Sequence, residues 1–258
     1  MSYTATTSGF PCWYELGTTA LDAADAFYSA ALGWTIASAG MPGLDYRIIS
    51  ASDGFGVGGM ASYDPSAPAA WRFYLEVADC DASAATVAAT GGTVVQEPAD
   101  IPGTGRFAVC LDPQGAAFAL LCPAPMNGEA PSVGAYAPAL TGHGAWHELS
   151  APEPEAAFDF YANLVGWTKG VTMDMGSDGV YQLFQAKGTD VGGMMRPMPG
   201  MAASWTSYFT VDSVAATAER IIAGGGTVMH GPAEVPGGAF IVIAADPQGA
   251  MFGVTGPQ

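Results

Sequence analysis

Two glutamates occupy equivalent positions in the two copies of an internal sequence repeat. Glu15 lies in Trp13-Tyr14-Glu15-Leu16, and this segment returns in the second half of the chain as Trp146-His147-Glu148-Leu149. Both segments are strand-like, and a carboxyl buried in such a strand, with its pKa raised by burial, is suited to act as a general acid or base. Since the residue occurs in both copies, a structural hydrogen-bonding role is the alternative for each. Glu15 and Glu148 are therefore the candidate catalytic residues.

Aromatic and basic side chains accompany these glutamates. Side chains alternate between the two faces of a strand, so Trp13 shares a face with Glu15, and Arg72 shares one with Tyr74 and Glu76. Rings that offer stacking area, with a few polar groups to fix orientation, suit a planar and partly aromatic ligand. The tryptophans of the repeated segments either stack on such a ligand or simply fill its place. The candidate ligand-binding residues are Trp13, Tyr46, Arg72, Tyr74, Arg106, Trp146, Tyr181 and Tyr208.

The two basic candidates distinguish the copies. Arg72 corresponds to Thr206, and Arg106 corresponds to Phe240. Arg72 either grips an anionic ligand or pairs with a neighbouring glutamate. Arg106 is either a contact at the rim of the site or a solvated charge. We expect the first copy to bind the polar or anionic end of a ligand.

The elements that position these residues recur with the repeat. The Phe-Tyr pair at 27–28 and the Gly-Trp pair at 33–34 return at 160–161 and 166–167, and the Asp-Pro-Gln-Gly turn at 112–115 returns at 246–249. Positions alike in both copies are expected to serve the fold, and positions that differ are where a site can specialise. In the first copy the pattern predicts helices and strands in the order βαβββ, twice over. The predicted ranges are 13–16, 23–32, 34–37, 46–51 and 56–61, then 71–77, 82–89, 93–97, 106–112 and 117–122.

The fold class predicted from this order is α+β, with four βαβββ modules that form two domains. The segment after residue 122 is rich in Pro, Gly and Ala and indicates a linker. The predicted boundaries are a first domain at 8–124, a linker at 125–140 and a second domain at 141–258.

Paired βαβββ modules, with Gly-Trp after the first helix and Asp-Pro-x-Gly before the last strand, resemble the vicinal oxygen chelate superfamily. That superfamily includes glyoxalase I, extradiol dioxygenases, and bleomycin- and fosfomycin-resistance proteins. The quoted motifs recur in order over nearly the whole chain. The Trp-x-Glu-Leu segments are also similar to two-copy, glyoxalase-like actinobacterial proteins often labelled hydroxylases.

The resemblance implies that the paired modules of each domain form cup-shaped mixed sheets. It also implies a divalent metal in the cup, held by His, Gln or Glu from the first and last strands of each module. Counting from the repeated motifs, the first-strand positions are Trp13, Trp146, Arg72 and Thr206, and the last-strand positions are Ala119, Gly253 and the neighbourhood of Met60 and Met194. None of these residues makes a good ligand set for such a metal, and an arginine would repel a cation. We therefore expect no metal and no other cofactor. A shift of one residue in the assumed strand register would instead turn His147 or Glu148 into the cup, where it could bind a metal ion.

Composition excludes several partners. The formal net charge is −17, which disfavours nucleic acid and anionic membranes as partners. The four cysteines lie in the first copy without a Cys-x-x-Cys pair, so reduced thiols are expected. We see no signal peptide in residues 1–11 and expect a cytoplasmic protein. Because its modules are covalently joined, it can be a monomer.

These observations leave three functions open. The leading one is metal-independent binding or transformation of a small hydrophobic, aromatic or polyketide-like molecule in natural-product biosynthesis or resistance. The alternatives are sequestration of a drug without catalysis, and a metal-dependent glyoxalase, lyase or extradiol dioxygenase. A fold that hosts all three classes does not choose among them.

Overall fold

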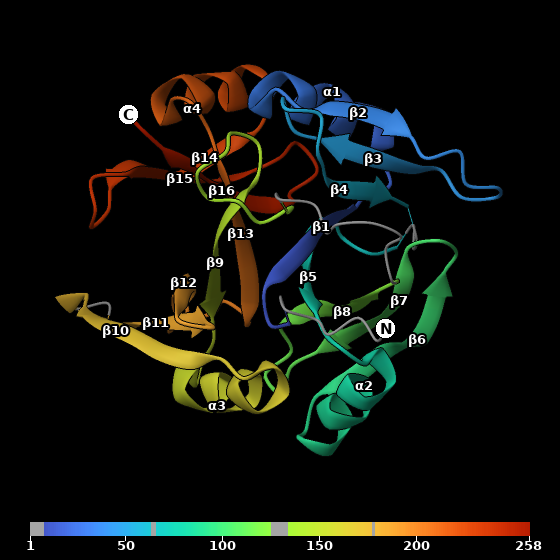
Figure 1. Ribbon diagram of the computed structural model, residues 1–258. Coiled ribbons are helices and arrows are strands. Elements are labelled where there is room, and N and C mark those ends of the chain that lie inside the picture. Colours follow the sequence, from blue (N-terminus) through green and yellow to red (C-terminus); the bar gives the residue numbers. More distant parts are fainter. Residues whose placement is uncertain (1–7, 63–65, 125–133, 177–178) are drawn as a thin grey trace. The chain divides into compact units, whose positions relative to one another are not determined.

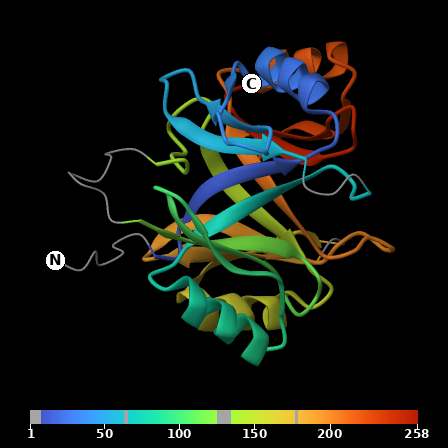
Figure 2. The ribbon, with the colours of Figure 1, turned by 90° about the vertical axis from the view of Figure 1, so that its right-hand side faces the viewer.

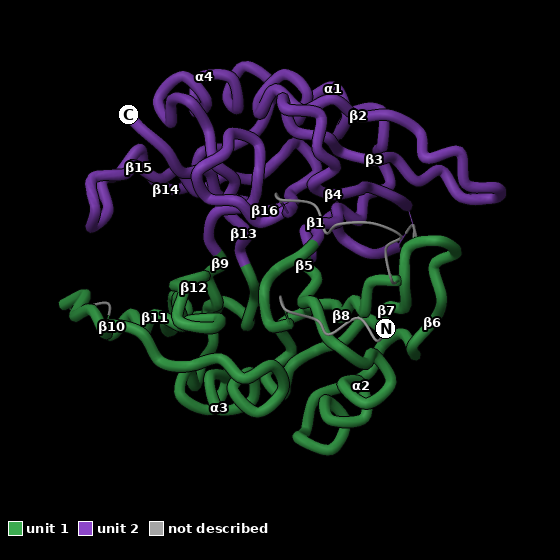
Figure 3. Tube along the Cα trace, in the orientation of Figure 1, with its two compact units in different colours: residues 1–12, 73–132, 147–205 green, residues 13–72, 133–146, 206–258 purple. Residues whose placement is uncertain are grey.

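The computed structural model describes residues 8–62, 66–124, 134–176 and 179–258. The chain divides into two compact units (Figure 3). Unit 1 contains residues 1–12, 73–132 and 147–205, and unit 2 contains residues 13–72, 133–146 and 206–258. Each unit is described below by itself.

The first repeat consists of two βαβββ modules (Figure 1). The first module runs β1 (Pro11–Gly17), α1 (Leu21–Leu32), β2 (Thr35–Ser38), β3 (Tyr46–Ser50) and β4 (Gly56–Ala61). The second module runs β5 (Ala70–Glu76), α2 (Cys80–Ala89), β6 (Thr93–Ile101), β7 (Gly105–Leu111) and β8 (Ala117–Pro123).

The second repeat has the same order of elements. The third module runs β9 (Gly144–Ser150), α3 (Pro154–Val165), β10 (Thr168–Asp174), β11 (Val180–Ala186) and β12 (Thr189–Met195). The fourth runs β13 (Ser204–Thr210), α4 (Val214–Ala223), β14 (Thr227–Glu234), β15 (Phe240–Ala245) and β16 (Met251–Gly256). The strand orders are β2-β3-β4-β1-β5-β8-β7-β6 and β10-β11-β12-β9-β13-β16-β15-β14, two mixed sheets of eight strands that confirm the predicted α+β class.

Local sequence explains where the helices begin and end. α1 and α3 end at Gly33 and Gly166, whose φ angles of 71° and 74° lie in the left-handed region that favours glycine. α2 begins after Asp79, whose side chain accepts the amide of Ala82 at 2.9 Å. α4 begins in the same way after Ser213.

Each unit combines one module from each repeat. Unit 1 packs α2 beside α3, and unit 2 packs α1 beside α4 (Figure 2). The boundaries between the units fall inside β1, β5, β9 and β13, the first strands of the four modules.

The repeated motifs meet inside each unit. In unit 2 the indole of Trp71 donates to the hydroxyl of Tyr28 at 2.8 Å, and that hydroxyl donates to Asp246 at 3.0 Å. In unit 1 the indole of Trp205 donates to Tyr161 at 2.9 Å, and Tyr161 donates to Asp112 at 3.2 Å. Each network joins the helix of one repeat to the Asp-Pro-Gln-Gly turn of the other, so the duplicated residues serve the fold, as expected.

Candidate functional site

Strand alternation decides which side chains of β1 and β5 lie opposite the helices. Tyr14 packs edge-on against Phe209 with ring centroids 5.1 Å apart, and Trp71 packs against Tyr28 on α1. These residues belong to the buried helix side of their sheets. Trp13, Glu15 and Arg72 therefore lie on the opposite face, as the alternation predicted.

Four of the candidates come together in unit 2, and we call them the Glu15 cluster: Trp13 and Glu15 on β1, Tyr46 on β3 and Arg72 on β5. The indole of Trp13 donates to the Tyr46 hydroxyl at 3.0 Å, and that hydroxyl donates to Glu15 Oε2 at 3.3 Å. Arg72 Nη1 lies 3.6 Å from Glu15 Oε1. Both carboxylate oxygens therefore face a partner, which matches the structural role considered for Glu15.

Burial gives the cluster its electrostatic character. Glu15 is only 4% exposed, whereas Arg72 keeps 27% of its side chain exposed. Burial, followed by the negative charge of Glu15, raises the pKa of Tyr46 well above its usual value, so the phenol keeps its proton and remains a donor. Arg72 Nε is buried and has no hydrogen-bond partner among the described residues.

A glycine makes room for the central tyrosine. Gly59 on β4 is the register partner of Glu15 on β1, and a Cβ at Gly59 would lie 2.2 Å from the Tyr46 hydroxyl oxygen. In unit 1 the same relation holds between Tyr181 and Gly193, where a Cβ would lie 2.1 Å from the ring. In both repeats, therefore, a glycine without a side chain leaves the space that the tyrosine ring occupies.

The remaining candidates do not all join this cluster. Trp146, half-buried, and Tyr208, 2% exposed, belong to unit 2. Tyr74 belongs to unit 1 and packs near Phe107, with ring centroids 6.4 Å apart. Glu148, half-buried, and Tyr181, 7% exposed, also belong to unit 1.

Arg106 belongs to unit 1 and forms ion pairs with two aspartates. Its neighbour Phe107 lies on the face of Tyr74, so alternation turns Arg106 to the helix side, where it pairs with Asp81 on α2 at 2.7 Å. A second ion pair with Asp100 spans 2.9 Å, and all three side chains are substantially exposed. These contacts fit the solvated-charge alternative.

The positions at which the superfamily holds its metal do not fit a divalent cation. In the first repeat they are occupied by Trp13, Arg72 and Ala119. The last-strand position of the first module is Gly59 rather than Met60, because Met60 pairs with Leu16 on the buried face. An indole, a guanidinium, a methyl group and a glycine offer no imidazole or oxygen ligand. The residues described contain no group of three or more His, Cys, Asp or Glu side chains that could hold a metal ion.

His147, which a one-residue shift in register would turn toward a metal, is instead a core residue. His147 is fully buried, its Nδ1 lies 2.8 Å from the carbonyl of Val191, and its ring packs against Phe73. Burial lowers the pKa of His147 to about 4, so the imidazole is neutral. The helix side of β9 therefore uses it as a core residue.

Sequence reasoning did not single out Glu76 as a site residue. Alternation placed it on the face of Arg72 and Tyr74, and the structure shows that it is 6% exposed. What the sequence could not reveal is that Glu76 Oε1 has no hydrogen-bond partner among the residues described.

Comparison with known proteins assigns the family. Residues 14–121 match the model of a glyoxalase-like domain, and residues 143–254 match that of the glyoxalase/bleomycin resistance protein/dioxygenase superfamily. The chain belongs to this superfamily, as the sequence motifs predicted. No helix among the residues described is long and apolar enough to cross a membrane.

Two relatives share nearly the whole chain. CFP32 of Mycobacterium tuberculosis, whose name proposes that it is a glyoxylase, is 35% identical over 96% of this chain and 95% of its own. The anthracycline biosynthesis protein DnrV of Streptomyces peucetius is 32% identical over 95% of this chain and 92% of its own.

Solved structures agree on the fold. The 2,3-dioxygenase LapB from Pseudomonas sp. KL28 is similar with a TM-score of 0.66 and 16% identity, over 98% of this chain and 94% of LapB. The Mn(II)-bound glyoxalase from Novosphingobium aromaticivorans is similar with a TM-score of 0.64 and 18% identity, over 96% of this chain and 81% of its own.

Proposed function

We propose that this protein binds a small, planar, hydrophobic molecule of aromatic or polyketide type, without a divalent metal, in a natural-product pathway. The observation that carries the proposal is the Glu15 cluster. It places an indole, a phenol, a guanidinium and a carboxylate on one sheet face. The side chains at the superfamily's metal positions are not a ligand set suited to a divalent cation. The similarity to DnrV supports the ligand class, because its name places that relative in anthracycline biosynthesis.

Each member of the cluster has a role in this proposal. Trp13 is half-buried and offers a ring face for stacking, a geometry that aromatic ligands favour. Tyr46 and Glu15 hold each other and the indole in place, so the platform is organised before the ligand arrives. Arg72 supplies donor groups beyond the single contact with Glu15 and can receive a carbonyl or anionic oxygen. Because both oxygens of Glu15 are engaged, we assign it to positioning rather than to proton transfer.

Removal of metal ions tests the first part of the proposal. We expect the protein to bind 1,8-dihydroxyanthraquinone, followed by quenching of tryptophan fluorescence, with the same affinity before and after dialysis against a chelator. The melting temperature should also stay the same, because no metal ion is bound at the superfamily's metal positions for the chelator to remove. Elemental analysis that finds about one Zn, Fe, Mn or Ni per chain, bound through side chains, would contradict the proposal and favour the metal-dependent alternative.

Replacing Arg72 by the residue of the other repeat tests the polar end of the site. Arg72→Thr should weaken the binding of anthraquinone-2-carboxylate on the order of ten-fold or more, since a buried charge-assisted hydrogen bond is lost. Arg196→Thr is the matched control, because Arg196 is 69% exposed and pairs with Glu153 at 3.7 Å. Equal affinity in the wild type and Arg72→Thr would reject the assigned role of Arg72.

A further inference from the structure

Glu76 in unit 1 is a buried acid that is not fully satisfied. It ends β5 and is 6% exposed. Its Oε1 is enclosed, yet it accepts no hydrogen bond from any residue that the structure describes. A buried carboxylate oxygen without a donor lowers the stability of the folded protein, because its lost hydration is not replaced. A group supplied by a ligand would remove that cost.

The surroundings of Glu76 are apolar and aromatic. Tyr74 lies two residues earlier on the same face of β5, and Leu121 on β8 is the register partner of Glu76. Leu121 is paired in turn with Phe107 on β7, whose ring lies near that of Tyr74. Phe107 is half-buried, and Tyr74 and Leu121 are buried, so the groups around Glu76 on this face are apolar and aromatic. A flat aromatic molecule matches the chemistry of these groups, with Glu76 as its polar contact.

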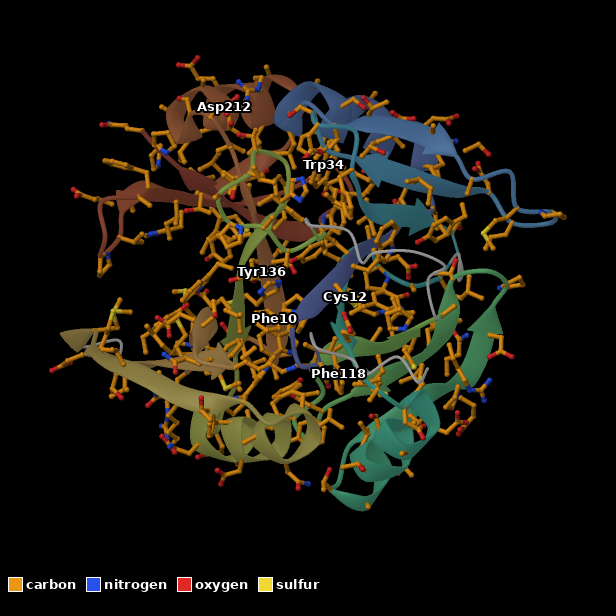
Figure 4. All side chains as sticks on the ribbon, in the orientation of Figure 1. Phe10, Cys12, Trp34, Phe118, Tyr136 and Asp212 are labelled. Carbon is orange, nitrogen blue, oxygen red and sulfur yellow. The ribbon has the colours of Figure 1, made fainter. Side chains whose placement is uncertain are left out.

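Two donors near Glu76 are used elsewhere. The amide of Glu76 donates to the carbonyl of Phe10 at 2.9 Å, and the Cys12 thiol donates to the carbonyl of Tyr74 at 3.4 Å. Phe10 and Cys12 are labelled in Figure 4. Burial, and then the negative charge of Glu76, raises the pKa of Cys12, so this thiol keeps its proton. None of these groups donates to Glu76 Oε1.

Two comparisons within the chain set Glu76 apart. Glu15 in unit 2 has a partner at each oxygen, Tyr46 at 3.3 Å and Arg72 at 3.6 Å. In the second repeat the position of Glu76 is held by Thr210, whose hydroxyl donates to the carbonyl of Pro138 at 2.9 Å. At this position the first repeat therefore has a carboxylate oxygen without a donor, whereas the second repeat has a hydroxyl that makes a hydrogen bond.

We propose that Glu76 is a specificity-determining residue whose Oε1 accepts a hydrogen bond from a hydroxyl group on an aromatic ligand. This inference rests on the proposed function and narrows it to hydroxylated planar molecules, such as phenols of the polyketide type. A carboxylate that accepts from a phenol forms a charge-assisted hydrogen bond, the stronger kind in proteins.

A pair of probes that differ in hydroxyl groups tests the assignment. The dissociation constants of 1,8-dihydroxyanthraquinone and 9,10-anthraquinone are measured by tryptophan fluorescence for the wild type, Glu76→Leu and Glu97→Leu. We expect the wild type to prefer the hydroxylated probe by about ten-fold or more, and Glu76→Leu to lose that preference while still binding 9,10-anthraquinone. Glu97→Leu, on an exposed position of β6, should keep the preference.

The outcomes separate the two proposals. A preference that survives in Glu76→Leu overturns the role of Glu76 and leaves the proposed function standing. Failure of the wild type to bind either probe overturns both. The melting temperature adds a measurement that needs no ligand: Glu76→Leu should raise it by a few degrees, because an unsatisfied carboxylate is replaced by an apolar group of similar size. A lower melting temperature would show that Glu76 has a structural partner and would overturn the inference.

Discussion

Asp112→Ala should lower the free energy of unfolding by about 3 kcal/mol or more, because it removes the acceptor at the centre of a buried network. Asp112 is 3% exposed, and its Oδ1 accepts the amides of Gln114 and Ala116, each at 2.9 Å. Its Oδ2 accepts from Tyr161, which also receives the indole N–H of Trp205. Alanine would leave two amides and a phenol without their acceptor in unit 1.

Urea titration followed by tryptophan fluorescence measures this loss, and two further variants separate its causes. Tyr161→Phe removes one neutral hydrogen bond to Asp112 and should cost only about 1 kcal/mol. Asp112→Asn keeps an acceptor for the two amides and should fall between the other variants. A loss for Asp112→Ala no greater than that for Tyr161→Phe would show that the turn finds other partners and that the network is not central to unit 1.

The duplicated residues of this network show why the fold could be predicted. Tyr28, Trp71 and Asp246 in unit 2 repeat the arrangement of Tyr161, Trp205 and Asp112 in unit 1. A residue that must fill the same position in two modules is retained in both, so a self-comparison of one sequence finds it. Helices ending at Gly33 and Gly166 were predictable for a similar reason, since their left-handed backbone favours glycine.

The sequence did not predict which modules pack against each other. The motifs indicate four modules, but nothing in their periodicity says that the helix of one repeat binds the Asp-Pro-Gln-Gly turn of the other. The hydrogen bond from Tyr28 to Asp246 joins opposite ends of the chain, and only folding brings these residues together. The domains at 8–124 and 141–258 follow the two repeats and stay a prediction, and residues 125–133 of the predicted linker lie outside the described residues. Each compact unit combines modules from both repeats.

The candidate site was predictable in part. Strand alternation correctly placed Trp13, Glu15 and Arg72 on one side of their strands, because each strand has a buried helix side that fixes its register. The ion pair of Arg106 was not predictable in this way, because its partner Asp81 lies on a helix that alternation in one strand does not describe. Alternation also could not distinguish Glu15, which has partners, from Glu76, which lacks one at Oε1, since hydrogen-bond satisfaction depends on residues distant in sequence.

His147 should make the protein less stable as the pH falls from about 6.5 to about 4. Burial lowers the folded-state pKa of His147 to about 4, whereas an unfolded chain has an ordinary histidine pKa of about 6.5. Between these values the unfolded state binds more protons, so the stability that the neutral imidazole contributes is fully present above pH 6.5 and is lost on acidification. Over the whole window the loss from this group is about 3 kcal/mol.

His147→Asn tests this prediction, because the asparagine amide can replace the donor that faces the Val191 carbonyl at 2.8 Å but does not titrate. Urea titrations at pH 7.5 and pH 5.0 should show that the wild type loses about 2 kcal/mol more than His147→Asn over this interval. Other acids titrate in both proteins alike, so the difference isolates His147. His230→Asn, which alters an exposed histidine on β14, should behave like the wild type. If His147→Asn instead keeps the full pH dependence of the wild type, His147 must have the same pKa in the folded and unfolded chain, and its burial would not disfavour the charged imidazole.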